Sequence, residues 1–139
     1  MTDLEIANKV AFSHLNTFYS WGGDDPSGFD CSGFVIEILK STGRLKRRFD
    51  TTASGLWQKF YLNKVDDPSE GCLVFFLNSS ATIRHVEYCL DEKFMIGASG
   101  GGKAVKQKED AIKANAFIKI RTIKSDQRSK LYVNPFKEN

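Results

Sequence analysis

Hydrophobic residues recur at helical spacing in the first part of the chain and alternate with polar residues further on. Apolar positions three or four residues apart predict an amphipathic helix between Leu4 and Phe18, and residues 2–5 form a capping box at its start. A second stripe of the same spacing covers residues 31–39 and ends at Gly43. We expect this second helix to be the more buried of the two.

The pattern changes from helical to extended after a turn at residues 66–68. Before that turn, residues 50–52 can cap a short third helix whose apolar positions lie between Ala53 and Phe60. After it, the segments with the pattern of strands are 73–77, 83–90, 94–98 and 117–123. A short helical piece is expected around residues 109–115. The tail from residue 125 shows no period, and we expect three apolar residues to pin it to the body: Tyr132, Val133 and Phe136.

Helices followed by antiparallel strands are the order of an α+β domain rather than of alternating βαβ units. A length of 139 residues suits one compact domain, and neither a repeat nor a linker divides the chain. We therefore expect a single domain over residues 1–139, in which residues 101–139 form a C-terminal extension with a further strand and a tail.

Charge is distributed unevenly along the chain. Residues 1–102 contain 10 basic and 13 acidic side chains, whereas residues 103–139 contain 10 basic and 4 acidic ones. A basic segment can contact nucleic acid, an anionic cell-wall polymer or a membrane surface. We favour a solvated lysine-rich surface without nucleic-acid binding, because no aromatic interleaving or nucleic-acid motif accompanies the charge. The apolar runs are too short to predict a membrane span.

The three cysteines, Cys31, Cys72 and Cys89, are odd in number and lack a C-x-x-C spacing. This pattern excludes a disulfide framework and a zinc ribbon, and it indicates a reducing compartment. We expect one working thiol, with no metal and no other cofactor.

Cys31 follows a glycine-rich loop and begins the second predicted helix. Unpaired backbone amides and the helix dipole at such a position favour a thiolate, which is a nucleophile. The alternative is a small buried residue at a helix start. A thiolate nucleophile needs a base, and the chain has 2 histidines. His14 lies on the apolar stripe of the first helix, whereas His85 shares one face of a predicted strand with Glu87 and Cys89.

The segments around Cys31 and His85 resemble the signatures of the NlpC/P60 cysteine peptidases. Residues 19–23 (YSWGG) and 28–35 (GFDCSGFV) resemble the family's first signature. Residues 71–76 (GCLVFF) resemble its GDLVFF strand, and the His85-Val86 pair resembles the start of its HVGIY strand. The order and spacing match over roughly residues 4–100, which is most of the chain.

This resemblance implies a papain-like α+β fold, in which N-terminal helices pack on an antiparallel β-sheet. Members of the family cleave peptide bonds in peptidoglycan stem peptides, often between D-glutamate and a diamino acid. By resemblance, Cys31 is the nucleophile, His85 is the base, and Tyr19 lies beside the nucleophile to position it or the oxyanion. The backbone N–H of Cys31 is a further oxyanion donor. Candidates for the substrate cleft are Trp21, Asp24, Asp30 and Ser32, with Asp25 and Lys103 as charged residues of its loops.

Three positions depart from the family's pattern. Cys72 stands where an aspartate is usual, and Glu87 stands where a glycine is usual. Gly97 takes the place of the family's third polar residue, often a histidine, 12 positions after the catalytic one. The last departure removes the group that would orient the imidazole.

A turn at residues 91–92 would place His85 opposite Gly97, which has no side chain to accept a hydrogen bond from the ring. A water, Ser99 or Glu87 can take that role. Glu87 lies ~7 Å along the strand from His85 and reaches the ring only if the strand bends. We therefore expect a cysteine–histidine dyad with an orienting water.

The leading hypothesis is a cysteine peptidase or amidase that acts on peptidoglycan stem peptides. Gly97 supports a second hypothesis, a catalytically weak or inactive domain used for binding or assembly, for instance in a phage tail. A third, an acyltransferase or a hydrolase of another amide, uses the same two residues. The N-terminus lacks the apolar region of a signal peptide, so we expect a cytoplasmic or phage-associated protein that acts on the cell wall. The sequence does not define an oligomeric state.

Overall fold

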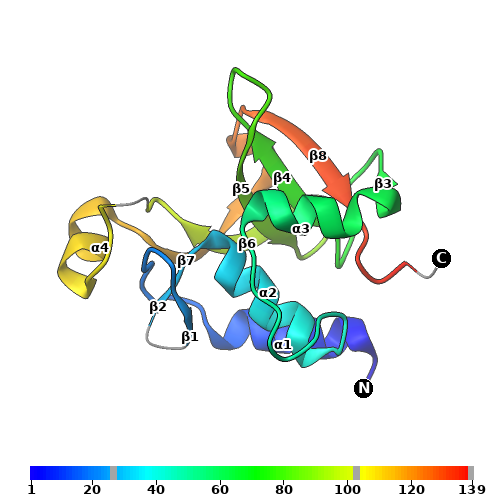
Figure 1. Ribbon diagram of the computed structural model, residues 1–139, viewed down its shortest axis with the longest axis horizontal. Helices are drawn as coiled ribbons and strands as arrows, with labels where there is room; N and C mark the ends of the chain where they lie inside the picture. The colour runs from blue at the N-terminus through cyan, green and yellow to red at the C-terminus, as the bar shows by residue number, and fades with distance from the viewer. Residues whose placement is uncertain (26–27, 102–103, 138–139) are drawn as a thin grey trace.

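Helices and a single large sheet form two layers in the computed structural model, which describes residues 1–25, 28–101 and 104–137 (Figure 1). Helix α1 (Asp3–Ser13) packs along α2 (Cys31–Ser41), and α2 packs on the sheet. Helix α3 (Ala53–Phe60) crosses the same layer, whereas α4 (Lys108–Ala114) stands apart from the other helices.

The sheet is antiparallel and has the strand order β3-β8-β4-β5-β6-β7. Its strands are β3 (Lys64–Val65), β4 (Leu73–Leu77), β5 (Ile83–Cys89), β6 (Phe94–Ser99), β7 (Phe117–Thr122) and β8 (Ser129–Val133). The remaining elements are a small pair, β1 (Asp24–Asp25) and β2 (Gly28–Phe29), and the 3-10 turns η1 (Tyr61–Asn63) and η2 (Ile123–Ser125). Helices that pack on an antiparallel sheet confirm the expected α+β class.

Helix α2 is central to the core, as its dense apolar pattern predicted. Phe34, Ile38 and Leu39 are completely buried against the sheet, whereas α1 buries only Ala7 and Ala11 completely. Burial of a side chain of this size contributes about 1.5–3 kcal/mol. The core therefore fixes the helix on which Cys31 lies.

A smaller apolar cluster occupies the other face of the sheet. Its buried members are Cys72, Val74, Phe76, Cys89, Met95 and Ile123. The sheet is thus covered on both faces near β5.

The C-terminal tail is more ordered than its sequence predicted. Residues 129–133 form β8, which lies between β3 and β4 and pairs Val133 with Leu73. Ser129 and Lys130 obscure the strand pattern, and the partners of β8 are far away in the sequence. The prediction that Val133 pins the tail is confirmed, because it is fully buried.

The first helix ends earlier than its apolar stripe. It stops at Ser13, and Asn16 adopts a left-handed conformation with φ of 72°. Phe18 then forms a bridge with Phe117 at the edge of the sheet. The chain leaves the helix because residues 16–18 pair with β7, while Leu15 and Phe18 still pack on the core.

The turn between β5 and β6 is wider than the two residues we expected. Asp91 Oδ1 accepts hydrogen bonds from the backbone N–H groups of Lys93 at 2.8 Å and Phe94 at 2.7 Å. The N–H of Leu90 donates to the carbonyl of Phe94 at 2.9 Å. This turn, which the Asp91 side chain closes, shifts the pairing register of β5 and β6 from the one we expected.

No helix within the described residues combines the length and the apolarity needed to cross a membrane.

Candidate active site

Cys31 occupies the first position of α2, directly after its N-cap, Asp30. The Asp30 carboxylate accepts hydrogen bonds from the N–H of Gly33 at 2.7 Å, from the N–H of Gly22 at 3.1 Å and from the hydroxyl of Ser32 at 3.3 Å. Burial raises the pKa of Asp30, although these hydrogen bonds act in the opposite direction. Asp30 thus caps the helix, and the same carboxylate ties the glycine loop to it.

Gly33 allows that loop to lie directly on the helix. A Cβ atom at position 33 would lie 2.1 Å from the backbone oxygen of Gly23. The N–H of Asp30 donates to the same oxygen at 2.9 Å. Because a methyl group cannot fit there, the position of Cys31 depends on a glycine two residues later.

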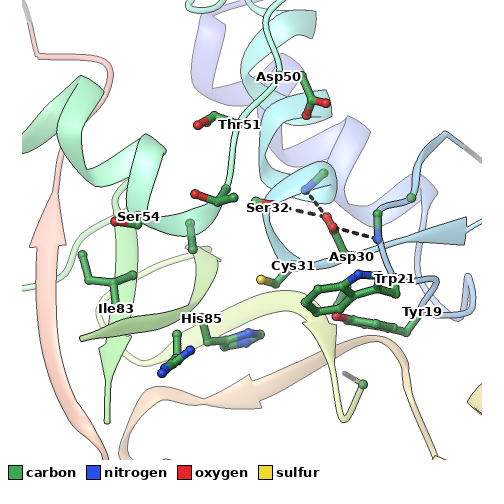
Figure 2. Close-up of a pocket in the computed structure, with 18 of the residues that line it drawn as sticks. Tyr19, Trp21, Asp30, Cys31, Ser32, Asp50, Thr51, Ser54, Ile83 and His85 are labelled. Carbon is green, nitrogen blue, oxygen red and sulfur yellow. Dashed lines mark hydrogen bonds between the residues drawn. The ribbon is translucent and has the colours of Figure 1, made fainter. Parts of the chain in front are cut away.

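Tyr19 lines the cleft next to Cys31 (Figure 2) and is 5% exposed. Burial raises the pKa of its phenol, and the negative charges of Cys31 and Asp30 act in the same direction. Its hydroxyl therefore keeps its proton at neutral pH and is a hydrogen-bond donor. The backbone of Gly101 packs directly against the ring, since a Cβ atom at position 101 would lie 2.2 Å from Tyr19 Cδ1.

His85 lies near the start of β5 and faces Cys31 across the floor of the cleft (Figure 2). Burial disfavours the charged ring, but hydrogen bonds and negative charges of Cys31 and Glu87 outweigh it and raise the pKa of His85 to about 9. His14 instead packs against the ring of Phe29, with centroids 4.9 Å apart. Of the 2 histidines, the one predicted as the base is therefore the one beside the thiol.

Glu87 contacts the far side of the His85 ring, where we expected a water. Its Oε2 atom lies 2.7 Å from Nε2 of His85, and its side chain is completely buried. His85 and Glu87 lie on one face of β5, in a stretch that pairs regularly with β4 from Phe76–His85 to Val74–Glu87. The β-bulge of this strand lies before His85, where Leu77 pairs with Ile83, so the contact does not depend on it. The expectation of an orienting water is therefore wrong for this structure.

The register of the β5–β6 hairpin also differs from the expected one. Tyr88 pairs with Ile96, which places Glu87 rather than His85 opposite Gly97. A Cβ atom at position 97 would lie 2.4 Å from Cγ of Glu87. The Glu87 side chain thus fills the space that a side chain at position 97 would need.

Two arginines and an aspartate support Glu87 from behind, and the sequence did not indicate them. Arg121, on β7, forms an ion pair with Oε2 of Glu87 and lies 3.4 Å from Oδ2 of Asp126. Arg128 lies 2.6 Å from the same Oδ2 atom. Hydrogen bonds from Arg128 hold the pKa of Asp126 well below its ordinary value, against a smaller effect of burial. Arg121 lies within the strand predicted for 117–123, and Asp126 and Arg128 follow that strand. Their spacing does not distinguish them from solvated surface charges.

The cleft above Cys31 and His85 has a volume of about 690 Å³. Three of the predicted cleft residues, Trp21, Asp30 and Ser32, line it, and Trp21 is 47% exposed. Ser99 is absent from the described residues that line the cleft, and it lies opposite Phe117 at the end of β6. The side chains of Asp24 and Asp25, and Lys103 as a whole, fall outside the described part of the chain.

One wall of this cleft was not predicted. It consists of the N-terminus of α3 and the preceding segment, including Asp50, Thr51 and Ser54. Ile83 and Arg84 of β5 also line the cleft, and Ile83 lies on the same side as Ser54 (Figure 2). The sequence suggested only a helix cap at residues 50–52, a role that Thr52 fulfils through the N–H of Gly55 at 3.2 Å.

The other two cysteines lie away from the cleft. Cys72 and Cys89 are fully buried in the smaller apolar cluster, and burial raises the pKa of the Cys89 thiol. All three thiols are free. Among the described residues, no group of three or more His, Cys, Asp or Glu side chains could hold a metal ion. The site therefore offers a thiol, an imidazole and a carboxylate in series.

Comparison with known proteins shows what this chain is similar to. The family model described as NlpC/P60 matches residues 16–127. A "Probable peptidoglycan endopeptidase LytE" of Bacillus subtilis is 31% identical over 103 residues, 73% of this chain and 29% of that protein. A "Probable endopeptidase p60" of Listeria seeligeri is 34% identical over 92 residues, 66% of this chain and 17% of that protein. The chain thus spans less than a third of the length of these relatives.

Solved structures share the fold. The NlpC/p60 domain of the peptidoglycan hydrolase SagA superposes with a TM-score of 0.66 at 25% identity, over 92% of this chain and 96% of that one. NlpC1 from Trichomonas vaginalis superposes with a TM-score of 0.74 at 17% identity, over 95% of this chain and 43% of that one.

Proposed function

The chain belongs to the NlpC/P60 family, and from this premise we propose that it is a cysteine peptidase that hydrolyses peptide bonds in peptidoglycan stem peptides. The observation that carries the proposal is the series of groups at the floor of the cleft. A thiol at a helix N-terminus lies beside an imidazole whose second nitrogen is bonded to a buried carboxylate. This is the arrangement that nucleophilic catalysis at an amide requires.

In the first step, Sγ of Cys31 attacks the amide carbonyl carbon after its proton has passed to His85. The ring is prepared for this transfer, because Glu87 accepts the Nε2–H and leaves Nδ1 as the basic nitrogen. The resulting oxyanion lies near the N–H of Cys31, at a helix terminus where backbone amides have no helical partner. The hydroxyl of Tyr19 is a second donor beside the sulfur.

The second step releases both products. The imidazolium of His85 protonates the leaving amine, the C–N bond breaks, and a thioester joins the substrate's acyl group to Cys31. His85 then removes a proton from a water that attacks the thioester, and the acid leaves as the thiol is restored. The cycle consumes one water and leaves the enzyme unchanged.

The hypothesis of an inactive binding domain loses its main support. It depended on Gly97 leaving His85 without an orienting side chain, and the Glu87 carboxylate lies at that ring nitrogen instead. A cell-wall substrate also gives the basic residues of 103–139 an anionic partner.

Digestion of purified peptidoglycan tests the proposal. We expect the wild-type protein to release soluble fragments with new amino termini within the stem peptide. Cys31→Ala should reduce the rate by at least about 10³-fold. Cys72→Ala is the matched control, because it removes a free thiol that is fully buried away from the cleft. Equal activity of wild type and Cys31→Ala, or loss of activity in both variants alike, would contradict the assignment of Cys31.

A further inference from the structure

We propose that Glu87 is the positioning residue of His85, and that Gly97 and Arg121 make this possible. The inference rests on the proposed function, since it concerns how the base of that reaction is oriented. The three residues lie on β5, β6 and β7, which are neighbours in the sheet. The orientation of His85 thus depends on residues from three neighbouring strands of the sheet.

The contact itself selects one form of the imidazole. Glu87 Oε2 lies 2.7 Å from Nε2 of His85, and a carboxylate can only accept a hydrogen bond. The neutral ring must therefore carry its proton on Nε2, with Nδ1 free to take the proton of Cys31. The same carboxylate stabilises the imidazolium once that proton has arrived.

Gly97 provides the space. The ideal Cβ atom at position 97 would lie 2.4 Å from Cγ, 2.7 Å from Cδ and 2.8 Å from Oε1 of Glu87. Those separations are shorter than van der Waals contact, so one pair of facing positions holds one side chain. The glycine at 97 therefore leaves free the space that the glutamate at 87 fills.

Arg121 fixes the rotamer of Glu87. Its guanidinium pairs with Oε2, the same oxygen that contacts His85, and Asp126 holds the guanidinium in turn at 3.4 Å. The second oxygen, Oε1, has no hydrogen-bond partner among the described residues, so both contacts converge on one atom. A buried carboxylate held in this way cannot turn away from the ring without losing its own ion pair with Arg121.

Substitution of Glu87 by Gln removes the charge while keeping the shape. We expect kcat for a stem peptide to fall by about 10–10⁴-fold with little change in KM, because the orienting group acts on the transition state. Glu92→Gln is the matched control, since it makes the same change at an exposed residue of the β5–β6 turn. Glu87→Asp is the second variant: it keeps the charge that Arg121 needs and withdraws the carboxylate from His85 by one methylene.

The protonation of His85 provides a readout that does not depend on catalysis. With 2 histidines in the chain, the imidazole signals can be followed by NMR as the pH is changed. Hydrogen bonds and negative charges of Cys31 and Glu87 outweigh burial and raise the pKa of His85 to about 9. In Glu87→Gln we expect its midpoint to fall by about 1–3 pH units, because an anion beside the ring is lost.

Moving the carboxylate from position 87 to position 97 tests whether the two positions share one space. Glu87→Gly should lose activity. The double variant Glu87→Gly, Gly97→Glu should be at least about tenfold more active than Glu87→Gly, because it returns a carboxylate to the same space.

The outcomes separate the two proposals. A folded Glu87→Gln protein with wild-type kcat and a wild-type midpoint for His85 would overturn the inference, as would a folded Glu87→Asp protein with wild-type kcat. A wild-type protein that cleaves no stem peptide would overturn the proposed function, while the His85 titration would still decide the role of Glu87.

Discussion

Replacement of Gly97 by alanine adds one methyl group where β6 faces the Glu87 side chain. The added carbon would lie 2.4 Å from Cγ of Glu87, and both residues are buried. Overpacking of a buried site by one methyl group costs about 1–3 kcal/mol. Because Glu87 is held by Arg121, relief by rotation would break an ion pair. We predict that the free energy of unfolding falls by about 1–3 kcal/mol.

A double-mutant cycle isolates this clash. In a Glu87→Ala background the three nearest atoms to the new methyl group are gone, so the cost of Gly97→Ala should fall below about 0.5 kcal/mol. Urea unfolding, followed by the fluorescence of the 2 tryptophans, measures all four proteins. An equal cost of Gly97→Ala in both backgrounds would refute the claim that positions 87 and 97 compete for one space.

Three further predictions concern the rest of the site. Gly33→Ala would place Cβ 2.1 Å from the backbone oxygen of Gly23, which can move only if the loop moves with it. We therefore expect the free energy of unfolding to fall by more than about 1 kcal/mol and hydrolysis to slow; an unchanged urea midpoint and an unchanged rate would contradict this. Tyr19→Phe should lower kcat by about 10–10²-fold while stability changes by less than about 1 kcal/mol, and unaltered kcat in steady-state assays would remove the hydroxyl from the mechanism. The raised pKa of His85 means that its imidazolium is present below a pH of about 9 and is lost above it, so kcat/KM should decline on the alkaline side near that value; a decline already near pH 7 would show that Cys31 and Glu87 do not stabilise the charged ring.

Local patterns were sufficient to predict the nucleophile's helix. Asp30 and the apolar stripe after Cys31 lie within one segment, and capping and burial of a helix depend on such near neighbours. The strand that carries His85 was equally predictable, because the alternation of apolar and polar residues along a strand is a local property. The resemblance to a family then connected the two residues.

The orienting group of His85 could not be predicted in the same way. Its identity depends on the turn at Asp91, whose side chain binds two backbone amides, and on the strand register that places Tyr88 opposite Ile96. A shift of this size decides whether His85 or Glu87 faces Gly97. The contact of Glu87 with Arg121 is also invisible in the sequence, since the two residues are 34 positions apart.

The strand β8 was missed for a related reason. Its polar first half obscures the alternation, and its place between β3 and β4 depends on pairing with distant segments. Long-range pairing in a sheet is set by the whole fold rather than by the segment itself.

The most direct test of the account is mass spectrometry of a synthetic stem peptide after incubation with the wild-type protein in heavy-oxygen water. We predict cleavage at an amide bond, with one heavy oxygen in the new carboxyl group, because water resolves the thioester formed on Cys31. The Cys31→Ala protein should give no such product, and Cys72→Ala should give it at the wild-type rate. An intact peptide after incubation with the folded wild-type protein, or the same labelled product from Cys31→Ala, would contradict the assignment of this chain as a cysteine peptidase.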